Sequence, residues 1–344
     1  MIIDDFLEPA QLTGFVREVP GPAQLTLNRF LPDRNIGDIE AALDSVTRTN
    51  RAAKFRAYDA ETPIGRRDQF ESKRVKLPPL GQKLPIGEYE RLTLERIRTG
   101  GDNRAGIVDA IYDDAETNTR AVYNRMEIAR GDVLDDGKFT LAGENGLKLE
   151  ADFGLPSSHI VTASTPWDDS ANASPLTDLR AWIATYVADT GERPAYMVVS
   201  EAIYSSLLLS AEVRQLSASL AGTPSLVTDQ QLGQVMGAFR LPQIIPYDTL
   251  LDVDGTTKRV LNDKKAIFLP SDPTSLGFTA WGITAEALEL AGGQNPSLEF
   301  NQLPGLVGVV IKEGDPVRIW TKVGAVGMPI ITDPRRLMVA TVLS

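Results

Sequence analysis

The sequence predicts an α+β fold, and three features of the chain carry this prediction. Residues 307–343 read as strand, turn, strand and a final strand, where most soluble chains have a polar tail. Apolar residues from Ile107 to Val133 recur at intervals of three, four or seven, the spacing of one face of a long helix. From Pro175 to Leu269, expected helices and strands alternate, as in an α/β segment.

The composition restricts the chemistry that the chain can perform. With 344 residues and 42% apolar content, the chain can bury one large core or two moderate ones. It has no cysteine and one histidine, which excludes disulfides, thiolate metal sites and two-histidine metal sites within one chain. We expect that histidine, His159, to be an ordinary loop or sheet-edge residue. No apolar run has membrane length, and Met1–Phe6 lacks the basic residues of a signal peptide.

Charge is distributed unevenly along the chain. The net charge of −11 argues against a general nucleic-acid binder, which needs cations to displace phosphate counterions. Residues 48–76 contain nine basic and four acidic side chains, a net +5, so the remainder carries −16, because −11 minus +5 is −16. A basic segment on an acidic body indicates that copies of the chain attract one another.

The N-terminal part is expected to extend from the globular body. Pro20-Gly21-Pro22 interrupts regular structure, so we interpret residues 1–30 as an extended arm. A short helix is predicted at Asp38–Asp44.

Residues 45–85 predict a two-stranded ribbon. Its strands are Arg51–Tyr58 and Gln69–Leu77, with a tip at Glu61–Gly65, and the prolines and glycines of residues 78–87 end it. A ribbon of this kind is marginally stable alone, so we expect a neighbouring subunit to cover it.

A long helix and a hairpin are predicted next. A helical segment at Glu88–Thr99 precedes the helix at Asn103–Ala129, and Arg130-Gly-Asp132 reads as the glycine stop that ends it. Alternating residues on both sides of Gly143–Gly146 predict a hairpin over residues 138–153.

The remaining elements follow from helical and strand periodicity. Helices are predicted at 176–189, 201–220 and 228–239, strands at 195–199, 242–247 and 266–269, and a hairpin at 250–260. Residues 285–344 are expected to return to β-structure and to rejoin the sheet begun near residue 138.

The motif search leaves no catalytic, cofactor or metal site. Asp252-Val-Asp-Gly255 has its glycine at position four, not position six as in an EF-hand loop, so we read it as a hairpin turn. Adjacent carboxylates such as Asp113-Asp114 and Asp135-Asp136 diverge on a helix and do not share a site.

Four motifs resemble segments of the lambda-type major capsid proteins of tailed phages. Arg130–Glu144 is similar to the family's helix end, Gly-Lys-aromatic-Thr strand and Gly-Glu turn. Leu149–Gly154 resembles its next strand, and Ser164-Thr-Pro-Trp167 its tryptophan-bearing segment. The apolar residues around Asp333-Pro334 resemble its closing segment. The order of the motifs covers the whole chain, which is identified as a member of the phage major capsid protein E family.

This resemblance implies the Hong Kong 97 phage capsid fold. Residues 1–45 would form the N-arm, 45–87 the extended E-loop, 88–170 and 285–344 the peripheral domain with its long spine helix, and 171–284 the axial domain. The function implied is that of a structural major capsid protein, not an enzyme. Copies would self-assemble into pentamers and hexamers and form the icosahedral head that encloses phage DNA.

The resemblance also implies the partners. A separate scaffolding protein is expected because no long coiled-coil segment precedes the arm; a portal protein is expected too, and a decoration protein is allowed. Double-stranded DNA would be enclosed without specific binding, with no membrane involved. The protein would belong to the virion capsid and assemble in the host bacterial cytoplasm.

Charge suggests how neighbouring subunits contact one another. We expect basic residues of the ribbon to meet acids on the spine helix of a neighbour. The basic residues are Lys54, Arg56, Arg66, Arg67, Arg74 and Lys76, and the acids are Asp113, Asp114 and Glu116.

Two alternatives remain. One keeps the fold but makes the shell an encapsulin-like compartment that holds a cargo enzyme. The other is an α/β-class enzyme that uses carboxylates within residues 171–284.

Overall fold

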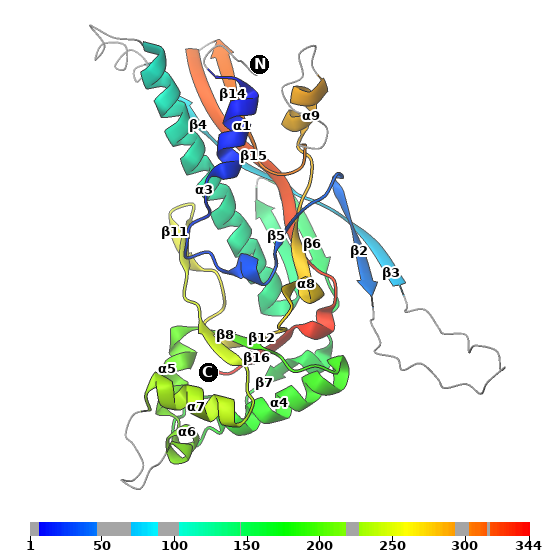
Figure 1. Ribbon diagram of the computed structural model, residues 1–344, viewed down its shortest axis with the longest axis vertical. Helices are drawn as coiled ribbons and strands as arrows, with labels where there is room; N and C mark the ends of the chain where they lie inside the picture. The colour runs from blue at the N-terminus through cyan, green and yellow to red at the C-terminus, as the bar shows by residue number, and fades with distance from the viewer. Residues whose placement is uncertain are drawn as a thin grey trace, which may run out of the picture. The chain divides into compact units, whose positions relative to one another are not determined.

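The computed structural model describes residues 7–46, 70–88, 103–144, 146–217, 227–292, 303–314 and 317–344. Helices and sheets both contribute, which confirms the predicted α+β class (Figure 1). The chain divides into two compact units, each built from three stretches. The first comprises Met1–Ala41, Val75–Arg130 and Phe278–Pro329, and the second comprises Ala42–Arg74, Gly131–Gly277 and Ile330–Ser344.

The first unit is built around a five-stranded sheet. Its strand order is β1-β13-β15-β14, and β4 also pairs with β15. The strands are β1 (Asp33–Asn35), β4 (Pro79–Ile86), β13 (Gly277–Trp281), β14 (Val307–Gly314) and β15 (Val317–Ile331). The helices are α1 (Pro9–Glu18), the 3-10 turn η1 (Leu27–Arg29), α3 (Asn103–Asp136) and α9 (Ala285–Gly292).

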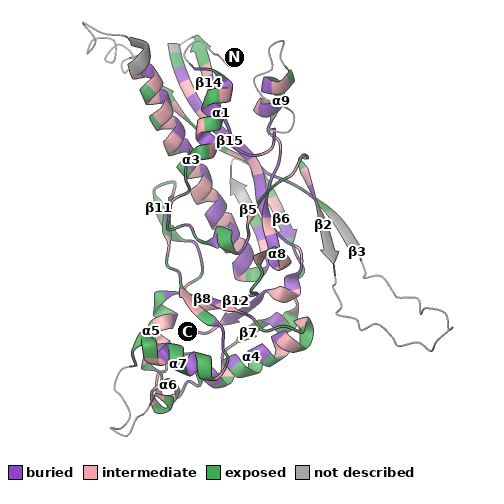
Figure 2. Ribbon diagram, viewed as in Figure 1, coloured by how far each residue is buried: buried purple, intermediate pink, exposed green. Residues whose placement is uncertain are grey.

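The predicted long helix is confirmed as α3. Its apolar stripe, which includes Ile107, Ile111 and Met126, is buried and packs into one core with Ile319 and Val323 of β15. Figure 2 shows the buried residues recurring along the helix. Spacing by three and four residues keeps these side chains on one face, so the charged residues lie on the other.

The N-terminal part contains a helix, so the expectation of an extended arm is wrong for residues 9–18. Leu12 and Val16, one turn apart in α1, are buried, and Thr13 Oγ1 donates to the backbone oxygen of Gly308 at 3.1 Å. Gly308 permits this approach, because a Cβ there would lie 2.9 Å from Val16 Cγ2. No side chain caps the start of α1, and Pro9 at its first position is the local signal that the sequence offers for it.

The helix predicted at Asp38–Asp44 is also wrong. Glu40–Val46 forms strand β2, which pairs with β3 (Phe70–Lys76) in a separate two-stranded sheet. Pairing with β3 overrides the weak helical propensity of the stretch. The second predicted ribbon strand coincides with β3. Arg51–Tyr58, the tip at 61–65 and all but the first residue of the helix predicted at Glu88–Thr99 lie outside the described residues.

The ribbon ends before the proline-rich residues 78–87 as expected, but these residues are themselves a strand, because Pro79–Ile86 forms β4 in another sheet. Strand β4 is antiparallel to β15 and pairs with no other strand in the described part of the sheet. Pro79 and Pro85 are therefore tolerated, since a proline without an N–H can occupy a strand with one unpaired edge.

The second unit contains a mixed sheet of order β7-β16-β12-β8-β9. Its strands are β7 (Ile160–Thr162), β8 (Tyr196–Val199), β9 (Gln243–Pro246), β12 (Lys265–Leu269) and β16 (Met338–Thr341). Its hairpins are β5 (Lys138–Glu144) with β6 (Leu147–Asp152) and β10 (Leu250–Val253) with β11 (Thr256–Arg259). Its helices are α4 (Pro175–Thr190), α5 (Glu201–Leu209), α6 (Ala211–Leu216), α7 (Asp229–Ala238) and α8 (Pro273–Leu276), with 3-10 turns η2 (Ser157–His159) and η4 (Pro334–Arg336).

The α/β segment and both hairpins confirm the sequence predictions, except that residues 218–220 lie outside the described ranges. The core of this part includes Trp167, Trp182 and Phe268. The expectation that residues 285–344 rejoin the sheet begun near residue 138 is wrong. Strands β5 and β6 pair only with each other in the described residues, β14 and most of β15 belong to the first unit, and β16 lies between β7 and β12.

Helix α3 runs past the position where a glycine stop was expected. Gly131 lies within the helix. Only a hydrogen fits between this position and the neighbouring loop, because a Cβ there would overlap the backbone oxygen of Val260. The helix ends at Asp136, and Gly137 follows with φ +73°, the left-handed conformation that favours glycine after a helix. The reading of Arg130-Gly-Asp132 as the helix end is therefore wrong.

The last turn of α3 is acidic. Asp132, Asp135 and Asp136 lie there with no basic residue, although the negative end of a helix dipole favours cations. The Asp135 carboxylate accepts from the backbone N–H of Asn262 at 3.1 Å, and Lys265 Nζ donates to the Asp135 backbone oxygen at 2.8 Å. Burial, aided by the neighbouring carboxylates and opposed by Lys265 and Asn262, raises the pKa of Asp135 to about 6.

Two glycines of α3 should respond oppositely to alanine. Gly131→Ala should lower the free energy of unfolding of the unassembled subunit by at least about 2 kcal/mol, because the added methyl overlaps Val260. Gly106→Ala, with nothing within 4 Å, should raise it by about 0.5–1 kcal/mol through helix propensity. Urea unfolding measures both, and equal effects would contradict the close packing at Gly131.

The ionised Asp135 should destabilise the unassembled subunit near neutral pH. Its pKa is higher in the folded state than its ordinary value of 3.8, so the folded state binds more protons between about pH 4 and pH 6. The free energy of unfolding therefore falls as pH rises through this window, by at most about 3 kcal/mol. Asp135→Asn should remove this slope and stabilise the subunit at pH 7.5, as measured by urea unfolding at both pH values. Asp136→Asn, at an exposed position, should change stability by less than about 0.5 kcal/mol, and an unchanged slope in Asp135→Asn would contradict the assignment.

Candidate inter-subunit surface

Alternation along the end of β3 separates basic from apolar side chains. Arg74 and Lys76 are exposed, whereas Val75 and Leu77 are buried, with 7% and 6% exposure. The N–H of Leu77 donates to the backbone oxygen of Ile39 at 3.0 Å, which ties the chain after β3 to the chain before β2. The apolar side of this stretch is thus anchored, and its two cations are exposed.

The other predicted cations, Lys54, Arg56, Arg66 and Arg67, lie outside the described residues. The strands that lead to and from them, β2 and β3, form a sheet of their own (Figure 1). Arg74 and Lys76 are therefore the members of the predicted basic set that the structure places.

The three predicted acids lie on α3 outside its buried stripe. Asp113 is exposed, and Asp114 and Glu116 are half-buried. Glu116 Oε1 lies 2.5 Å from Arg120 Nη2, a pair one turn apart that partly neutralises this acid. Lys76 makes no ion pair with any of the three within the described part of the same chain.

The acids predicted from the sequence did not include one further acid of this surface, Asp109. Asp109 is exposed and precedes Asp113 by four residues, as Asp113 precedes Glu116 by three. These intervals place the three side chains on one face of α3, so they form a stripe (Asp109, Asp113 and Glu116, hereafter the acidic stripe). The same spacing is visible in the sequence and would have indicated Asp109.

A buried ion network holds α3 in place within the first unit. Arg130 Nη2 lies 2.5 Å from Asp33 Oδ1, Nη1 lies 3.1 Å from Glu127 Oε2, and Nε donates to Thr279 Oγ1 at 2.9 Å. Glu127 Oε1 also accepts from the N–H of Leu27 at 2.8 Å. Burial, together with the charge of Asp33 and against that of Arg130, raises the pKa of the nearby Tyr123. Each buried charge has a partner, so we interpret the network as one that stabilises the fold.

The structure assigns a packing role to the single histidine. His159 is fully buried in η2, the turn that leads into the edge strand β7. Its Nδ1 lies 2.9 Å from the Leu337 oxygen, its Nε2 lies 3.0 Å from Asp189 Oδ2, and its ring stacks on Tyr186.

Among the described residues, no group of three or more His, Cys, Asp or Glu side chains could hold a metal ion. None of the helices in these ranges has the length and apolar character that a membrane crossing requires.

Comparison with known proteins identifies the family. A family model described as phage major capsid protein E matches residues 8–342. The fold is similar to that of a protein described as a prophage capsid protein from E. coli CFT073, with a TM-score of 0.62, 16% identity, and coverage of 98% of this chain and 99% of that chain. It is also similar to a phage-related protein from Bordetella bronchiseptica RB50, with a TM-score of 0.60, 10% identity, and coverage of 96% and 95%. No curated protein matches the sequence at a significant level.

The solved structures bear on the fold, and the family match bears on the function. The arrangement of helices and sheets is that of the Hong Kong 97 type of capsid protein. The family match extends over nearly all of the sequence. The chain therefore belongs to the phage major capsid protein E family and is a structural protein of the capsid shell, a component of the virion.

Proposed function

We propose that copies of this chain assemble into pentamers and hexamers, and that these form the icosahedral head that encloses phage double-stranded DNA. The family match supports the role in the shell. The separate two-stranded sheet β2–β3 supports the mode of assembly, because such a ribbon is marginal without another surface to cover it. A neighbouring subunit supplies that surface, in head-to-tail contacts that close into rings.

The role that we propose for each segment follows the fold of the family. Residues 1–45 act as the N-arm, 45–87 as the E-loop, 88–170 and 285–344 as the peripheral domain, and 171–284 as the axial domain. The E-loop of one copy reaches α3 of the next, where its basic residues meet the acidic stripe and Asp114. Opposite charges on the two surfaces guide the encounter and set its register.

The wider assembly involves other components. A separate scaffolding protein directs assembly in the host cytoplasm, a portal protein occupies one vertex, and the shell has room for a decoration protein on its surface. The acidic body of the chain keeps the inner wall from binding the enclosed DNA.

The family match favours this function over the two alternatives. It names a phage shell protein, not a compartment for cargo enzymes. It also names a component of a capsid and no enzymatic activity.

Charge reversal in the E-loop should block assembly. Arg66→Glu combined with Arg67→Glu places acids against the acidic stripe, so the yield of shells should fall at least about tenfold. Electron microscopy and size-exclusion chromatography measure the yield, and circular dichroism of the unassembled subunit checks its fold.

A matched control and a charge-exchange variant complete this test. Lys148→Glu with Lys258→Glu makes the same charge change at exposed positions of β6 and β11 and should leave the yield unchanged. Adding Asp113→Arg and Glu116→Arg to the E-loop variant should restore part of the yield by exchanging the charges. Normal shells from the E-loop variant would show that this contact is not needed.

A further inference from the structure

One face of the sheet in the first unit carries an unusual set of side chains. Trp320, Lys322 and Gly324 of β15 lie on this face, because the residues that alternate with them are buried on the α3 side. The antiparallel register places Lys83 of β4 opposite Lys322, and Gly81 opposite Gly324. Lys83 and Gly81 are exposed.

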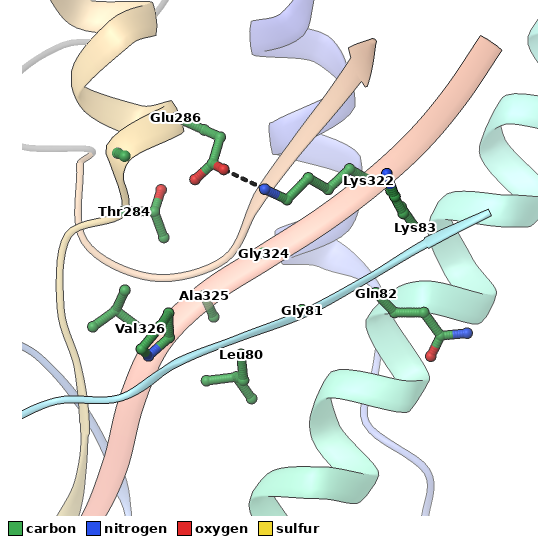
Figure 3. A pocket seen from close by; sticks show the side chains of 12 residues that line it. Leu80, Gly81, Gln82, Lys83, Thr284, Glu286, Lys322, Gly324, Ala325 and Val326 are labelled. Carbon is green, nitrogen blue, oxygen red and sulfur yellow. Dashed lines mark hydrogen bonds and ion pairs between the residues drawn. The ribbon is translucent and has the colours of Figure 1, made fainter. Parts of the chain in front are cut away.

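Among the described residues, α9 covers this face over β14, whereas Gly81 and Lys83 of β4 are exposed. Val307 and Val309 of β14 are buried against Ala287 and Leu290 of α9. Beside α9 remains a hollow of about 380 Å³, lined by β4, by β15 and by the start of α9. Figure 3 shows Lys322 directed toward Glu286 across this hollow. We call it the β4–β15 hollow.

The charges that line the hollow do not balance. Like charges placed directly opposite on neighbouring strands repel, as Lys83 and Lys322 do here. Lys322 Nζ forms an ion pair with Glu286 Oε1. Burial alone would raise the pKa of Glu286, but its hydrogen bonds, chiefly from Lys322, lower it overall.

Lys83 has an aromatic partner in place of a carboxylate. Its Nζ lies 4.1 Å from the centre of the Trp320 ring, and the described residues offer it no ion pair. The lining thus holds two ammonium groups and one carboxylate. A further carboxylate placed between Lys83 and Lys322 would complete the set.

Two glycines line the hollow. Gly81 and Gly324 face each other across the strands, and a Cβ at Gly81 would lie 2.7 Å from the backbone oxygen of Val323, so the close packing of the strands requires that glycine. A Cβ at Gly324 would lie 3.8 Å from Lys322 Cε, an ordinary contact, so the sheet itself does not require glycine at this position. The absence of a side chain there keeps the space free.

We propose that a carboxylate-bearing segment of a second copy of this chain docks in the β4–β15 hollow, with its carboxylate between Lys83 and Lys322. This inference rests on the proposed function, because it names a second contact by which copies hold one another in the shell. It involves residues distinct from those of the contact between the E-loop and α3.

Charge and size together select a second copy as the occupant. Outside residues 48–76 the chain carries −16, so a neighbouring copy presents many acidic segments to a site with an excess of cations. A hollow of about 380 Å³ holds a few side chains, not a folded partner. Covering the hollow would also exclude water from Lys83 and strengthen its pairing with the incoming carboxylate.

The first experiment uses variants that fill the hollow or reverse a charge in it. Gly324→Val should fill part of the hollow from a position where the added Cβ makes only ordinary contacts, and Lys83→Glu should repel the incoming carboxylate, so each should lower the yield of shells at least about tenfold. Gly314→Val, which adds the same side chain where nothing lies within 4 Å, should assemble like the wild type. Wild-type yields from both site variants would overturn the proposal. Failure of the wild type itself to form shells would instead overturn the proposed function.

The second experiment leaves the sequence unchanged. Shells assembled from an equal mixture of ¹⁴N- and ¹⁵N-labelled protein are treated with a carbodiimide, which joins a lysine to a carboxylate in direct contact. Mass spectrometry should find Lys83 in mixed-isotope linked peptides from shells and not from unassembled subunits. The Lys322–Glu286 pair gives an unmixed link within one copy as an internal control. Detection of the control without any mixed link at Lys83, or a link at Lys83 only to another virion protein, would overturn the proposal.

Discussion

A buried arginine holds the first unit together. The Arg130 side chain is 4% exposed, and its guanidinium bonds to Asp33, Glu127 and Thr279 at once. An unpaired buried charge costs several kcal/mol, so these partners cannot separate without a large loss of stability. The chain around Asp33, helix α3 and strand β13 are therefore locked to one another. The outer face of α3 keeps a set orientation on the sheet, as a contact surface for another subunit must.

This constraint relates the two surfaces proposed for contact. The apolar stripe of α3 packs on one side of β15, so the acidic stripe points away from the sheet. The β4–β15 hollow lies on the opposite side of the same strands. In the proposed assembly, one copy thus uses both sides of a single sheet, the acidic stripe for an E-loop and the hollow for a carboxylate of another copy, as head-to-tail contacts require.

The elements that could be predicted from the sequence carry their own local signals. Helix α3 has an apolar residue at nearly every third or fourth position, and the hairpins have Asn-Gly or Asp-Gly turns. Elements that depend on distant partners were missed. Helix α1 relies on the bare backbone at Gly308, and β4 tolerates Pro79 and Pro85 only because one of its edges is unpaired. Gly131 looked like a helix stop because nothing nearby in sequence indicates that Val260 packs against it. Of the candidate site, Arg74, Lys76 and the α3 acids lie at exposed or half-buried positions, whereas their partners across subunits remain a prediction.

The position of β16 has a consequence for synthesis on the ribosome. This strand follows β7, β8, β9 and β12 in the sequence, yet it lies between β7 and β12 and pairs with both. While residues 338–341 are still untranslated, β7 has no neighbour in that sheet and the core around Phe268 lacks Met338 and Ala340. A nascent or prematurely terminated polypeptide therefore cannot complete this unit. Defective chains would be exposed to proteolysis before they could be built into a particle.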